Sequence, residues 1–310
     1  MLDFRELVLS DRSYYLSAHG ANENSKYSFA QTFAWRRAYH IEVCVREQGL
    51  LFTSQYGGDP YGLVAPLEFE PCAPVAPLVE DMLAHFRQLG RPFFLKYVCP
   101  QMREKLEREM PGRFVFLPAR DDFEYIYHTR DLIELAGKKY HGKRNHINAF
   151  THAHPYIFRP YEPAMFDDVM EVQAEWLEGK DRTEDDETFA ISELLANYAA
   201  LELRGGVIEC EGKIIAFSLG EKIAPTAAMM IIEKADPGYE GAFQVINREM
   251  ASLFSDTLVI NRGEDMGIEG LRQSKLTYHP KYLLEKDNCI LAGEQALFPQ
   301  LTGMLPDSQT

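Results

Sequence analysis

The chain has 310 residues, a formal net charge of −15 and a hydrophobic content of 46%. This apolar content is enough for a substantial core, and the length favours two domains over one, because single domains usually have about 100–200 residues. The acidic balance argues against broad nucleic-acid binding, which needs clustered Lys and Arg to neutralise phosphates. A local basic pocket for one phosphorylated ligand is still compatible with it.

Five cysteines are scattered through the chain without any C-x-x-C spacing, namely Cys44, Cys72, Cys99, Cys210 and Cys289. This pattern predicts buried free thiols in a reducing compartment and argues against a disulfide framework or a zinc site. The N-terminus lacks a basic region followed by an apolar run, and no apolar run approaches the roughly 18 residues that a membrane span requires. We therefore expect a cytoplasmic protein without a membrane span.

The first 130 residues alternate between strand and helix patterns. Extended segments are predicted at 4–9, 93–98, 114–118 and 123–127, a β-hairpin at 42–54, and helices at 12–19, 28–39, 79–89 and 102–110. Apolar residues three or four apart support the helices, and alternation or short apolar runs support the strands. We expect these residues to form a first α/β unit.

The most basic stretch follows in residues 131–155. Its spacing predicts one helix over 131–153, because Pro155 prevents continuation and disfavours helix at His154. Four cations within seven residues repel one another, and an anionic ligand would relieve that repulsion. The candidate phosphate-binding residues are Lys138, Lys139, Lys143, Arg144 and Asn145. The alternative is that the helix dipole favours these cations near the helix C-terminus, or that they pair with an acidic surface.

The second half repeats the pattern of the first. Strands are predicted at 157–160, 227–233, 257–261, 282–285 and 289–292, a hairpin at 207–222, helices at 164–177, 189–203, 243–254 and 268–278, and a solvated acidic loop at 178–187. The predicted fold class is therefore α/β with mixed sheets (α+β), as two similar units at 1–130 and 156–310 joined by the basic helix of 131–155.

The order of elements in residues 207–292 resembles the core of the GNAT acyltransferases. That resemblance implies that the donor lies where the strand at 227–233 separates from the strand at 257–261. It also implies that a turn and helix N-terminus cradle the donor phosphates, with candidate residues Gly238, Gly241, Ala242 and Gln244. Gly238 and Phe243 depart from the pattern of members that use acetyl-CoA. The alternative is an ordinary β–α turn that needs glycine for backbone reasons.

Two further motifs carry resemblances. Lys143-Arg144-Asn145-His146-Ile147 is similar to a motif of the Fem aminoacyltransferases, which are tandem GNAT proteins. The segments LIELAGKKYHGKRNHINAF, EKADPGYEGAFQVINREM and NRGEDMGIEGLRQSKLTYHP resemble an uncharacterised bacterial family classed with the C-terminal domain of phosphatidylglycerol lysyltransferases. The resemblance implies a tandem GNAT fold and a transferase ancestry, without supplying a substrate.

A polar run at 261–272 lies where a predicted strand ends and a helix begins, a place where ligands gather in open α/β sheets. Glu264 or Asp265 is a candidate proton acceptor for an attacking amine, and Tyr278 is a candidate general acid. The candidate substrate-binding residues are cations able to hold a carboxylate or phosphate, namely Arg262, Arg272 and Lys275. The alternative for Asp265 is a helix cap.

The sequence thus predicts an N-acyltransferase or aminoacyltransferase-like protein. It would transfer an activated acyl or aminoacyl group to an amine or hydroxyl, with acyl-CoA or aminoacyl-tRNA as donor substrate and no tightly bound cofactor. A small-molecule substrate is expected, whereas the net charge disfavours tRNA. The histidines at 141, 146, 152 and 154 do not place three on one helical face, so no metal site is expected. The alternative is a non-catalytic ligand-binding protein that retains the fold.

Overall fold

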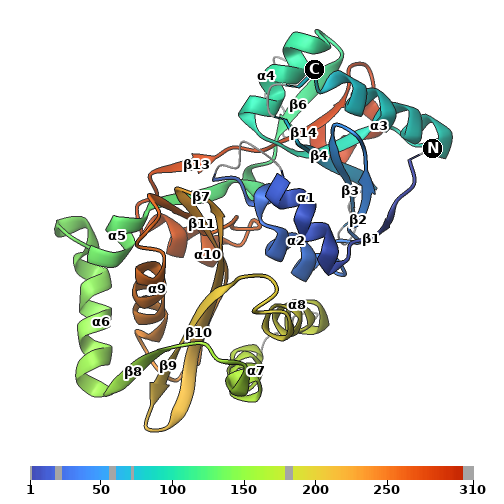
Figure 1. The fold of residues 1–310 in the computed structure, drawn as a ribbon. Coiled ribbons are helices and arrows are strands. Elements are labelled where there is room, and N and C mark those ends of the chain that lie inside the picture. The colour runs from blue at the N-terminus through green and yellow to red at the C-terminus, as the bar shows by residue number, and fades with distance from the viewer. Residues whose placement is uncertain (1, 18–22, 56–60, 71–72, 179–183, 303–310) are drawn as a thin grey trace. The chain divides into compact units, whose positions relative to one another are not determined.

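Residues 2–17, 23–55, 61–70, 73–178 and 184–302 are described by a computed structural model of the chain. The chain divides into two compact units (Figure 1). Unit 1 contains Met1–Gly20, Arg36–Phe123 and Leu284–Thr310, and unit 2 contains Ala21–Trp35 and Glu124–Leu283. Each unit is built on its own seven-stranded sheet.

The sheet of unit 1 has the strand order β1-β2-β3-β4-β5-β14-β6. Its neighbours pair antiparallel except β4 and β5, which run parallel. The strands are β1 (Arg5–Glu6), β2 (Glu42–Val45), β3 (Gly49–Ser54), β4 (Gly62–Glu68), β5 (Phe94–Val98), β6 (Phe114–Pro118) and β14 (Asp287–Leu291). The hairpin predicted at 42–54 is confirmed as β2 and β3.

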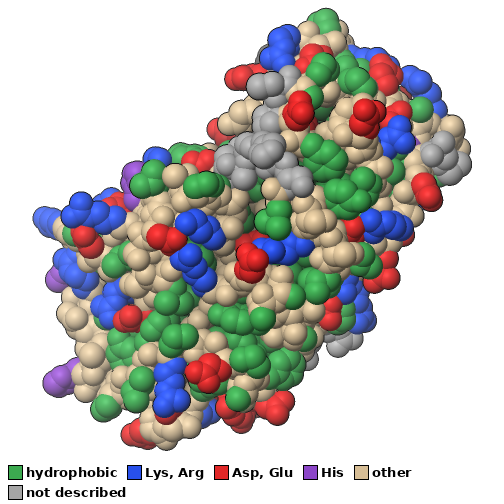
Figure 2. Space-filling view, in the orientation of Figure 1, with side chains coloured by type: hydrophobic (Ala, Val, Ile, Leu, Met, Phe, Trp, Pro, Cys, Tyr) green, Lys and Arg blue, Asp and Glu red, His purple; other side chains and the backbone are tan. Residues whose placement is uncertain are grey.

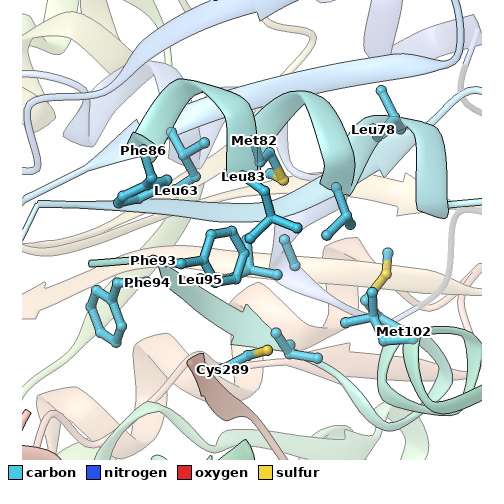
Figure 3. Packing of buried hydrophobic residues seen from close by; sticks show 14 of the residues in the cluster. Leu63, Leu78, Met82, Leu83, Phe86, Phe93, Phe94, Leu95, Met102 and Cys289 are labelled. Carbon is cyan, nitrogen blue, oxygen red and sulfur yellow. The ribbon is translucent and has the colours of Figure 1, made fainter. Parts of the chain in front are cut away.

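The helices of unit 1 enclose an apolar core. They are α1 (Arg12–Ser17), α3 (Ala76–Leu89), α4 (Pro100–Glu109) and α11 (Pro299–Thr302). Apolar residues recur at helical spacing on α3, and Leu83 and Phe86 are buried with Phe93 and Leu95 of the neighbouring strand segment (Figure 3). Gly90 ends α3 in the left-handed conformation, with φ of 64°, which glycine adopts at low cost.

The sheet of unit 2 has the order β13-β7-β12-β11-β10-β9-β8. Here β11 and β12 run parallel, whereas β7 pairs antiparallel with β12 and the β8–β11 neighbours pair antiparallel. The strands are β7 (Glu124–His128), β8 (Tyr156–Pro160), β9 (Arg204–Cys210), β10 (Lys213–Ala224), β11 (Ala227–Ala235), β12 (Val259–Asn261) and β13 (Tyr282–Leu284).

Helices cover both faces of this sheet. They are α2 (Phe29–Trp35), α5 (Thr129–Glu134), α6 (His141–Ala153), α7 (Phe166–Leu177), α8 (Glu184–Ala196), α9 (Ala242–Leu253) and α10 (Glu269–Leu276). Successive side chains of a strand point to opposite faces. Glu233 of β11 contacts Asn247 of α9, whereas Lys234 pairs with Glu187 of α8. The α9 layer, with α5 and α6 beside it, therefore lies opposite the α7–α8 layer (Figure 1).

The two sheets share one topology, and each half of the chain contributes one strand to the sheet of the other half. β14 comes from the C-terminal part but pairs with β5 and β6, and β7 follows β6 in sequence but pairs with β12. Two similar mixed α/β units were predicted, and the structure confirms them. The predicted boundaries differ from the observed units, because long-range strand pairing, which local periodicity does not encode, places β7 and β14.

The segment 23–35 also belongs to unit 2, although the sequence assigns it to the first unit. Two buried glutamates bind it. Glu124 of β7 accepts hydrogen bonds from the amide and hydroxyl of Ser25, and Glu221 of β10 accepts from the hydroxyl of Ser28 and the amide of Ala30. The second contact places a carboxylate at the start of α2, where it satisfies a free amide and complements the helix dipole.

The predicted continuous helix over 131–153 is wrong. α5 ends at Glu134, Leu135 and Gly137 take positive φ angles of 45° and 84°, and a 3₁₀ turn at Lys138–Tyr140 leads into α6. The guanidinium Nη1 of Arg144 donates to the carbonyls of Leu135 and Gly137, which holds the break in place. Gly137 permits this break, because it adopts positive φ without a steric penalty.

Other features of the described residues bear on the sequence predictions. Cys44, Cys99, Cys210 and Cys289 are free and buried, while Cys72 lies outside the described residues. Of the predicted acidic loop, 179–183 also lie outside them, and Glu184 already begins α8. In the part of the chain that the structure describes, no helix is both long enough and apolar enough to cross a membrane.

Candidate functional site

The parallel strands of unit 2 separate shortly after they meet. β11 pairs with β12 at Ala227–Val259, Ala228–Ile260 and Met229–Asn261 only, and β11 then continues to Ala235. The register between β10 and β11 also shifts between Leu219 and Gly220, which gives β11 an extra residue at Ile231. Such bulges are frequent beside functional sites. We call the place where β11 and β12 separate the strand fork of unit 2.

A buried acid–base cluster lies at this fork. Glu233 of β11 accepts a hydrogen bond from Nη2 of Arg262 at 3.0 Å and one from Nδ2 of Asn247 at 2.9 Å, each on a different carboxylate oxygen. Arg262 directly follows β12, and its side chain is only 12% exposed. One ion pair thus joins β11 to the residue that follows β12, and Asn247 of α9 donates its side-chain amide to the same carboxylate.

Two buried polar atoms of this cluster lack a protein partner among the described residues. They are Nη1 of Arg262 and Oδ1 of Asn247. A buried donor or acceptor without a partner costs about 1–3 kcal/mol. Such atoms in a native structure often mark a place where a ligand or an ordered water completes the bonding.

Lys143 of α6 adds a second cation to the same cluster. Its ammonium lies 4.0 Å from the ring centroid of Tyr278, and the guanidinium carbon of Arg262 lies 4.8 Å from the same centroid. Burial, with the positive charge of Arg262, lowers the pKa of Lys143 to about 8, although Glu233 opposes the shift. Within the described chain no carboxylate lies within ion-pair distance of Lys143.

Tyr278 is buried, and its hydroxyl pKa is raised by that burial. Its backbone carbonyl accepts a hydrogen bond from Tyr140 at 3.0 Å, and its ring meets that of Tyr127 edge-on at 6.5 Å. The hydroxyl therefore stays protonated across the physiological pH range. It can donate a proton or hydrogen bond but is a poor base.

Lys275 of α10 holds the loop after β12. Its ammonium donates to the carbonyls of Arg262 at 2.6 Å and Glu264 at 2.5 Å. Burial lowers the pKa of Lys275 to about 8. Lys275 is a predicted substrate-binding residue, and both of these contacts of its ammonium are with the backbone of the loop.

Asp265, a candidate proton acceptor, is fully buried and heavily hydrogen-bonded. It accepts from the hydroxyl of Tyr125 at 2.6 Å, from Nε and Nη2 of Arg272 at 3.0 and 2.8 Å, and from the amide of Gly267 at 3.0 Å. This arrangement orders the loop ahead of α10, and it engages the guanidinium of Arg272 in hydrogen bonds to Asp265. Glu264 is half-buried and is the other predicted acceptor.

The remaining basic candidates do not join the cluster. Lys138 and Lys139 are exposed, Lys139 lies 3.4 Å from Asp131, and Arg144 binds backbone carbonyls. Asn145 is exposed and contacts His141. Figure 2 shows Lys, Arg and His side chains spread over α5 and α6. The break ahead of α6 explains the difference, since it takes Lys138 and Lys139 off the helical face of Lys143.

Within the predicted phosphate cradle at 238–244, Gly241 packs against α6, whereas Gly238 is exposed. A Cβ at Gly241 would lie 2.6 Å from the backbone carbonyl oxygen of His146 and 3.0 Å from Cβ of Phe150. The amide of Gly238 donates to Asp236, and the amides of Ala242 and Gln244 donate to nearby carbonyls. Close packing against α6 explains the glycine at 241, whose φ is 94°.

Sequence reasoning missed Glu233, Asn247 and Tyr127. One signal was available: Glu233 is a charged residue at the end of the apolar run AAMMII in β11. A charge in a buried strand is costly unless it is paired, which makes it a candidate for a site. Asn247 lies on the buried face of α9, where its neighbours Val245 and Ile246 are apolar. No local signal joined Glu233 and Asn247 to Lys143, because they lie 90 and 104 positions away in the sequence.

Among the described residues, no group of three or more His, Cys, Asp or Glu side chains is placed to hold a metal ion. The chemistry that the fork offers is that of two cations, one carboxylate, an amide and a protonated phenol. These groups can bind an anion or a polarised carbonyl and can supply a proton.

The paired topology and the fork define the class of fold. It matches a tandem GNAT protein from the clavulanic acid biosynthesis pathway, with a TM-score of 0.53 and 11% identity over 94% of this chain and 99% of that one. It also matches FemX, with a TM-score of 0.58 and 8% identity over 97% of this chain and all of that one. The chain therefore has a tandem GNAT, Fem-like fold.

The family model described as phosphatidylglycerol lysyltransferase, C-terminal, matches residues 18–288. The chain belongs to that family. L-PGS from Bacillus licheniformis is similar, with a TM-score of 0.67 and 15% identity over 97% of this chain and 98% of that one.

A protein of unknown function from Bacteroides thetaiotaomicron VPI-5482 is more similar. The two are 32% identical, with a TM-score of 0.86 over 94% of this chain and all of that one. An uncharacterised protein from Mycoplasmoides gallisepticum is 25% identical over 174 residues, which are 52% of this chain. The match spans about half of that curated relative, at 54% of its length.

Proposed function

We propose that the protein transfers an activated acyl or aminoacyl group to an amine or hydroxyl acceptor at the strand fork of unit 2. One observation carries the proposal. β11 and β12 part after Met229 and Asn261, and largely buried charged side chains, led by Glu233 and Arg262, gather where they part. A purely structural core has little use for a buried, incompletely bonded arginine at this point.

In this proposal the free edge of β11 beyond Met229 binds the donor. Its backbone groups no longer pair with β12, so an extended amide-containing arm can add to the edge as a further strand would. Binding there fixes the reacting carbonyl next to the acceptor, and such orientation contributes much of the rate in group transfer.

Proton transfer is assigned to two groups. Tyr278, whose raised pKa keeps it protonated, donates to the leaving oxygen or sulfur. Glu264 is the proposed proton acceptor, because the hydrogen bonds to Tyr125 and Arg272 commit Asp265 to ordering the loop.

An aminoacyl ester such as aminoacyl-tRNA fits the site better than acyl-CoA. The backbone of α6 lies against Gly241, where the pyrophosphate of CoA would approach the helix N-terminus, and the carbonyl of His146 there repels an anion. The family name, phosphatidylglycerol lysyltransferase, supports the same choice. A non-catalytic binding protein is the alternative, favoured by the loss of Asp265 as a free base.

The test pairs donor binding with transfer. Purified protein is screened by thermal shift with aminoacyl-tRNA and acyl-CoAs, and donor deacylation to an amine acceptor is followed by mass spectrometry. A donor at about 100 times its dissociation constant should stabilise the fold by about 2.7 kcal/mol. Stabilisation by a donor without transfer would support the non-catalytic binding protein. The absence of both stabilisation and transfer with every donor would contradict both hypotheses.

Tyr278→Phe isolates the chemistry from the fold. We expect transfer to fall about 10²–10⁴-fold, the usual range for a lost general acid, with donor binding retained. Tyr282→Phe, which changes a partly exposed tyrosine on β13, is the matched control and should leave transfer unchanged. Equal rates in the two variants would remove Tyr278 from the mechanism.

A further inference from the structure

We propose that the strand fork of unit 2 holds a small oxyanion, a carboxylate or a phosphate group, between Lys143 and Arg262. The inference does not depend on the proposed transfer, because a non-catalytic binding protein would hold the same ion. The oxyanion would neutralise positive charge at the fork that the protein's own carboxylates do not.

The cations at the strand fork outnumber the carboxylates. Two cations, Lys143 and Arg262, lie within 5 Å of the ring centroid of Tyr278. The carboxylate bonded to this cluster is Glu233, and both of its oxygens are already used, one by Arg262 and the other by Asn247. The neighbouring carboxylate of Asp265 is bonded to Arg272. Lys275 and Glu264 of the same loop and helix offset each other in charge, so the fork carries one excess positive charge.

The guanidinium of Arg262 has a hydrogen-bond donor that the described residues do not use. Nη2 of Arg262 is bound to Glu233, whereas its buried Nη1 has no partner among the described residues. A guanidinium is a fork of donors that can serve two acceptors at once. One acceptor is present, and in this proposal an oxyanion that enters beside Lys143 supplies the second. An anionic oxygen is the acceptor that gives such a donor its strongest hydrogen bond.

The second cation of this pair is Lys143. Its ammonium is half-buried against the face of Tyr278, without a carboxylate in contact among the described residues. The groups that act on its charge are Arg262, which opposes protonation, and Glu233, which favours it. Burial lowers the pKa of Lys143 most and Arg262 adds to the effect, so the pKa falls to about 8. An oxyanion between the two cations would reverse this by favouring the charged ammonium.

These observations predict coupled binding of an anion and a proton. Below pH 8 Lys143 is mostly charged, and the oxyanion binds with full affinity. Above pH 8 binding has to bring a proton to Lys143, so affinity should fall by up to tenfold per pH unit. A surface site made of exposed lysines, which titrate near 10.4, would not show this dependence until higher pH.

The experiment is isothermal titration calorimetry on the full chain in a low-salt buffer free of phosphate and carboxylates. Inorganic phosphate and succinate are the probes, which distinguish the two sources of an oxyanion, and lysine amide is the cationic control. We expect one oxyanion to bind and the lysine amide not to bind at this site. Failure of both oxyanions to bind at pH 7 would overturn the proposal.

Two lysine variants locate the ion. Lys143→Met should weaken binding about tenfold or more, the usual effect of removing one charge-assisted hydrogen bond. Lys138→Met, on the exposed turn just ahead of α6, is the matched control and should bind like the unchanged protein. Equal affinity in Lys143→Met and the unchanged protein would place the ion elsewhere and overturn the proposal.

If Lys143→Met does not fold, the pH dependence of the unchanged protein decides. Loss of affinity between pH 8 and 9.5 supports the proposal, and constant affinity contradicts it. Lys143→Arg keeps the charge and should retain most of the binding but shift the pH dependence beyond pH 10, because arginine stays charged. Transfer assays are read separately, so anion binding without transfer would contradict only the proposed function.

Discussion

Each unit contains a parallel strand pair, β4 with β5 in unit 1 and β11 with β12 in unit 2, and each pair is flanked by an exchanged strand. What surrounds them differs. In unit 1, Leu63, Phe93, Phe94 and Leu95 fill the space with apolar side chains, and Cys289 of β14 completes it (Figure 3). In unit 2 the corresponding region gathers Glu233, Arg262, Asn247 and Lys143.

Unit 1 also contains buried charges at its parallel pair, Lys96 of β5 and Glu68 of β4. Glu68, at the end of β4, lies 3.0 Å from the ammonium of Lys105 in α4, which compensates it. In unit 2 the pairing is incomplete, because a donor of Arg262 and the ammonium of Lys143 are left over. The same topology thus serves as a packed core in one unit and as a candidate site in the other, which agrees with function residing in sites placed on a fold.

The largest expected effect is in the core of unit 1. Phe93→Ala removes a fully buried ring and should lower the free energy of unfolding of the protein by about 3–5 kcal/mol. Denaturant unfolding followed by circular dichroism measures the loss. Anion binding by the protein that remains folded should be unchanged. A changed affinity would mean that the two regions are not separate in function.

Glu233→Gln tests the ion pair of unit 2. Removing one partner of a buried pair usually costs about 3–5 kcal/mol, but the leftover charge here can bind an anion from solution. We expect a loss of about 2–3 kcal/mol in low salt, partly recovered on adding phosphate. Phe93→Ala serves as the comparison, since phosphate should not restore its lost packing beyond the effect on the unchanged protein. Absence of this difference would contradict an anion site at the fork.

Tyr125→Phe tests the support behind the fork. Asp265 would lose its hydrogen bond from the hydroxyl at 2.6 Å, and the buried carboxylate would be left one donor short. We expect a loss of about 1–3 kcal/mol in thermal or denaturant unfolding. Tyr282→Phe, on β13, removes a more exposed hydroxyl that is bonded to Glu23, and it should cost less, about 0.5–1 kcal/mol. A similar small change in both would mean that Tyr125 does not order the loop.

The pH dependence of stability gives a smaller effect. The pKa of Lys143 in the folded protein is about 8, below its value of about 10.4 in an unfolded chain. Between these values the unfolded state binds more protons, so the free energy of unfolding should rise with pH. Lys143→Met should lose this contribution, while Lys275, lowered in the same direction, retains its own. Parallel curves for the two proteins from pH 7.5 to 9.5 would contradict the assignment.

Local sequence patterns predicted most of the secondary structure and the repetition of one unit. Periodicity predicted the hairpins, the α3 and α9 helices and the repetition of one unit, because each depends on neighbouring residues. They did not predict that β7 joins the sheet of unit 2 and β14 the sheet of unit 1, or that 23–35 belongs to unit 2. Those outcomes depend on contacts between segments that are distant in the sequence. The buried carboxylates Glu124 and Glu221, which bind 23–35, look like ordinary strand residues in the sequence.

The site was predicted in part for the same reason. Arg262, Asp265, Lys275 and Tyr278 lie within 17 consecutive residues, and the structure brings them together on one loop and helix. Lys143 was predicted through the basic stretch, but its neighbours there face elsewhere, because Gly137 breaks the helix ahead of them. Glu233 and Asn247 enter the site only through the three-dimensional arrangement of β11 and α9.

Hydrogen–deuterium exchange tests the central claim, that the donor binds at the strand fork of unit 2 and not at the parallel pair β4–β5 of unit 1. The full chain is compared with and without a saturating, hydrolysis-resistant aminoacyl-adenosine amide. We predict slower exchange in residues 229–235 and 261–278, with no change in 62–68 and 94–98. Slower exchange confined to unit 1, or no change in either unit, would contradict the account.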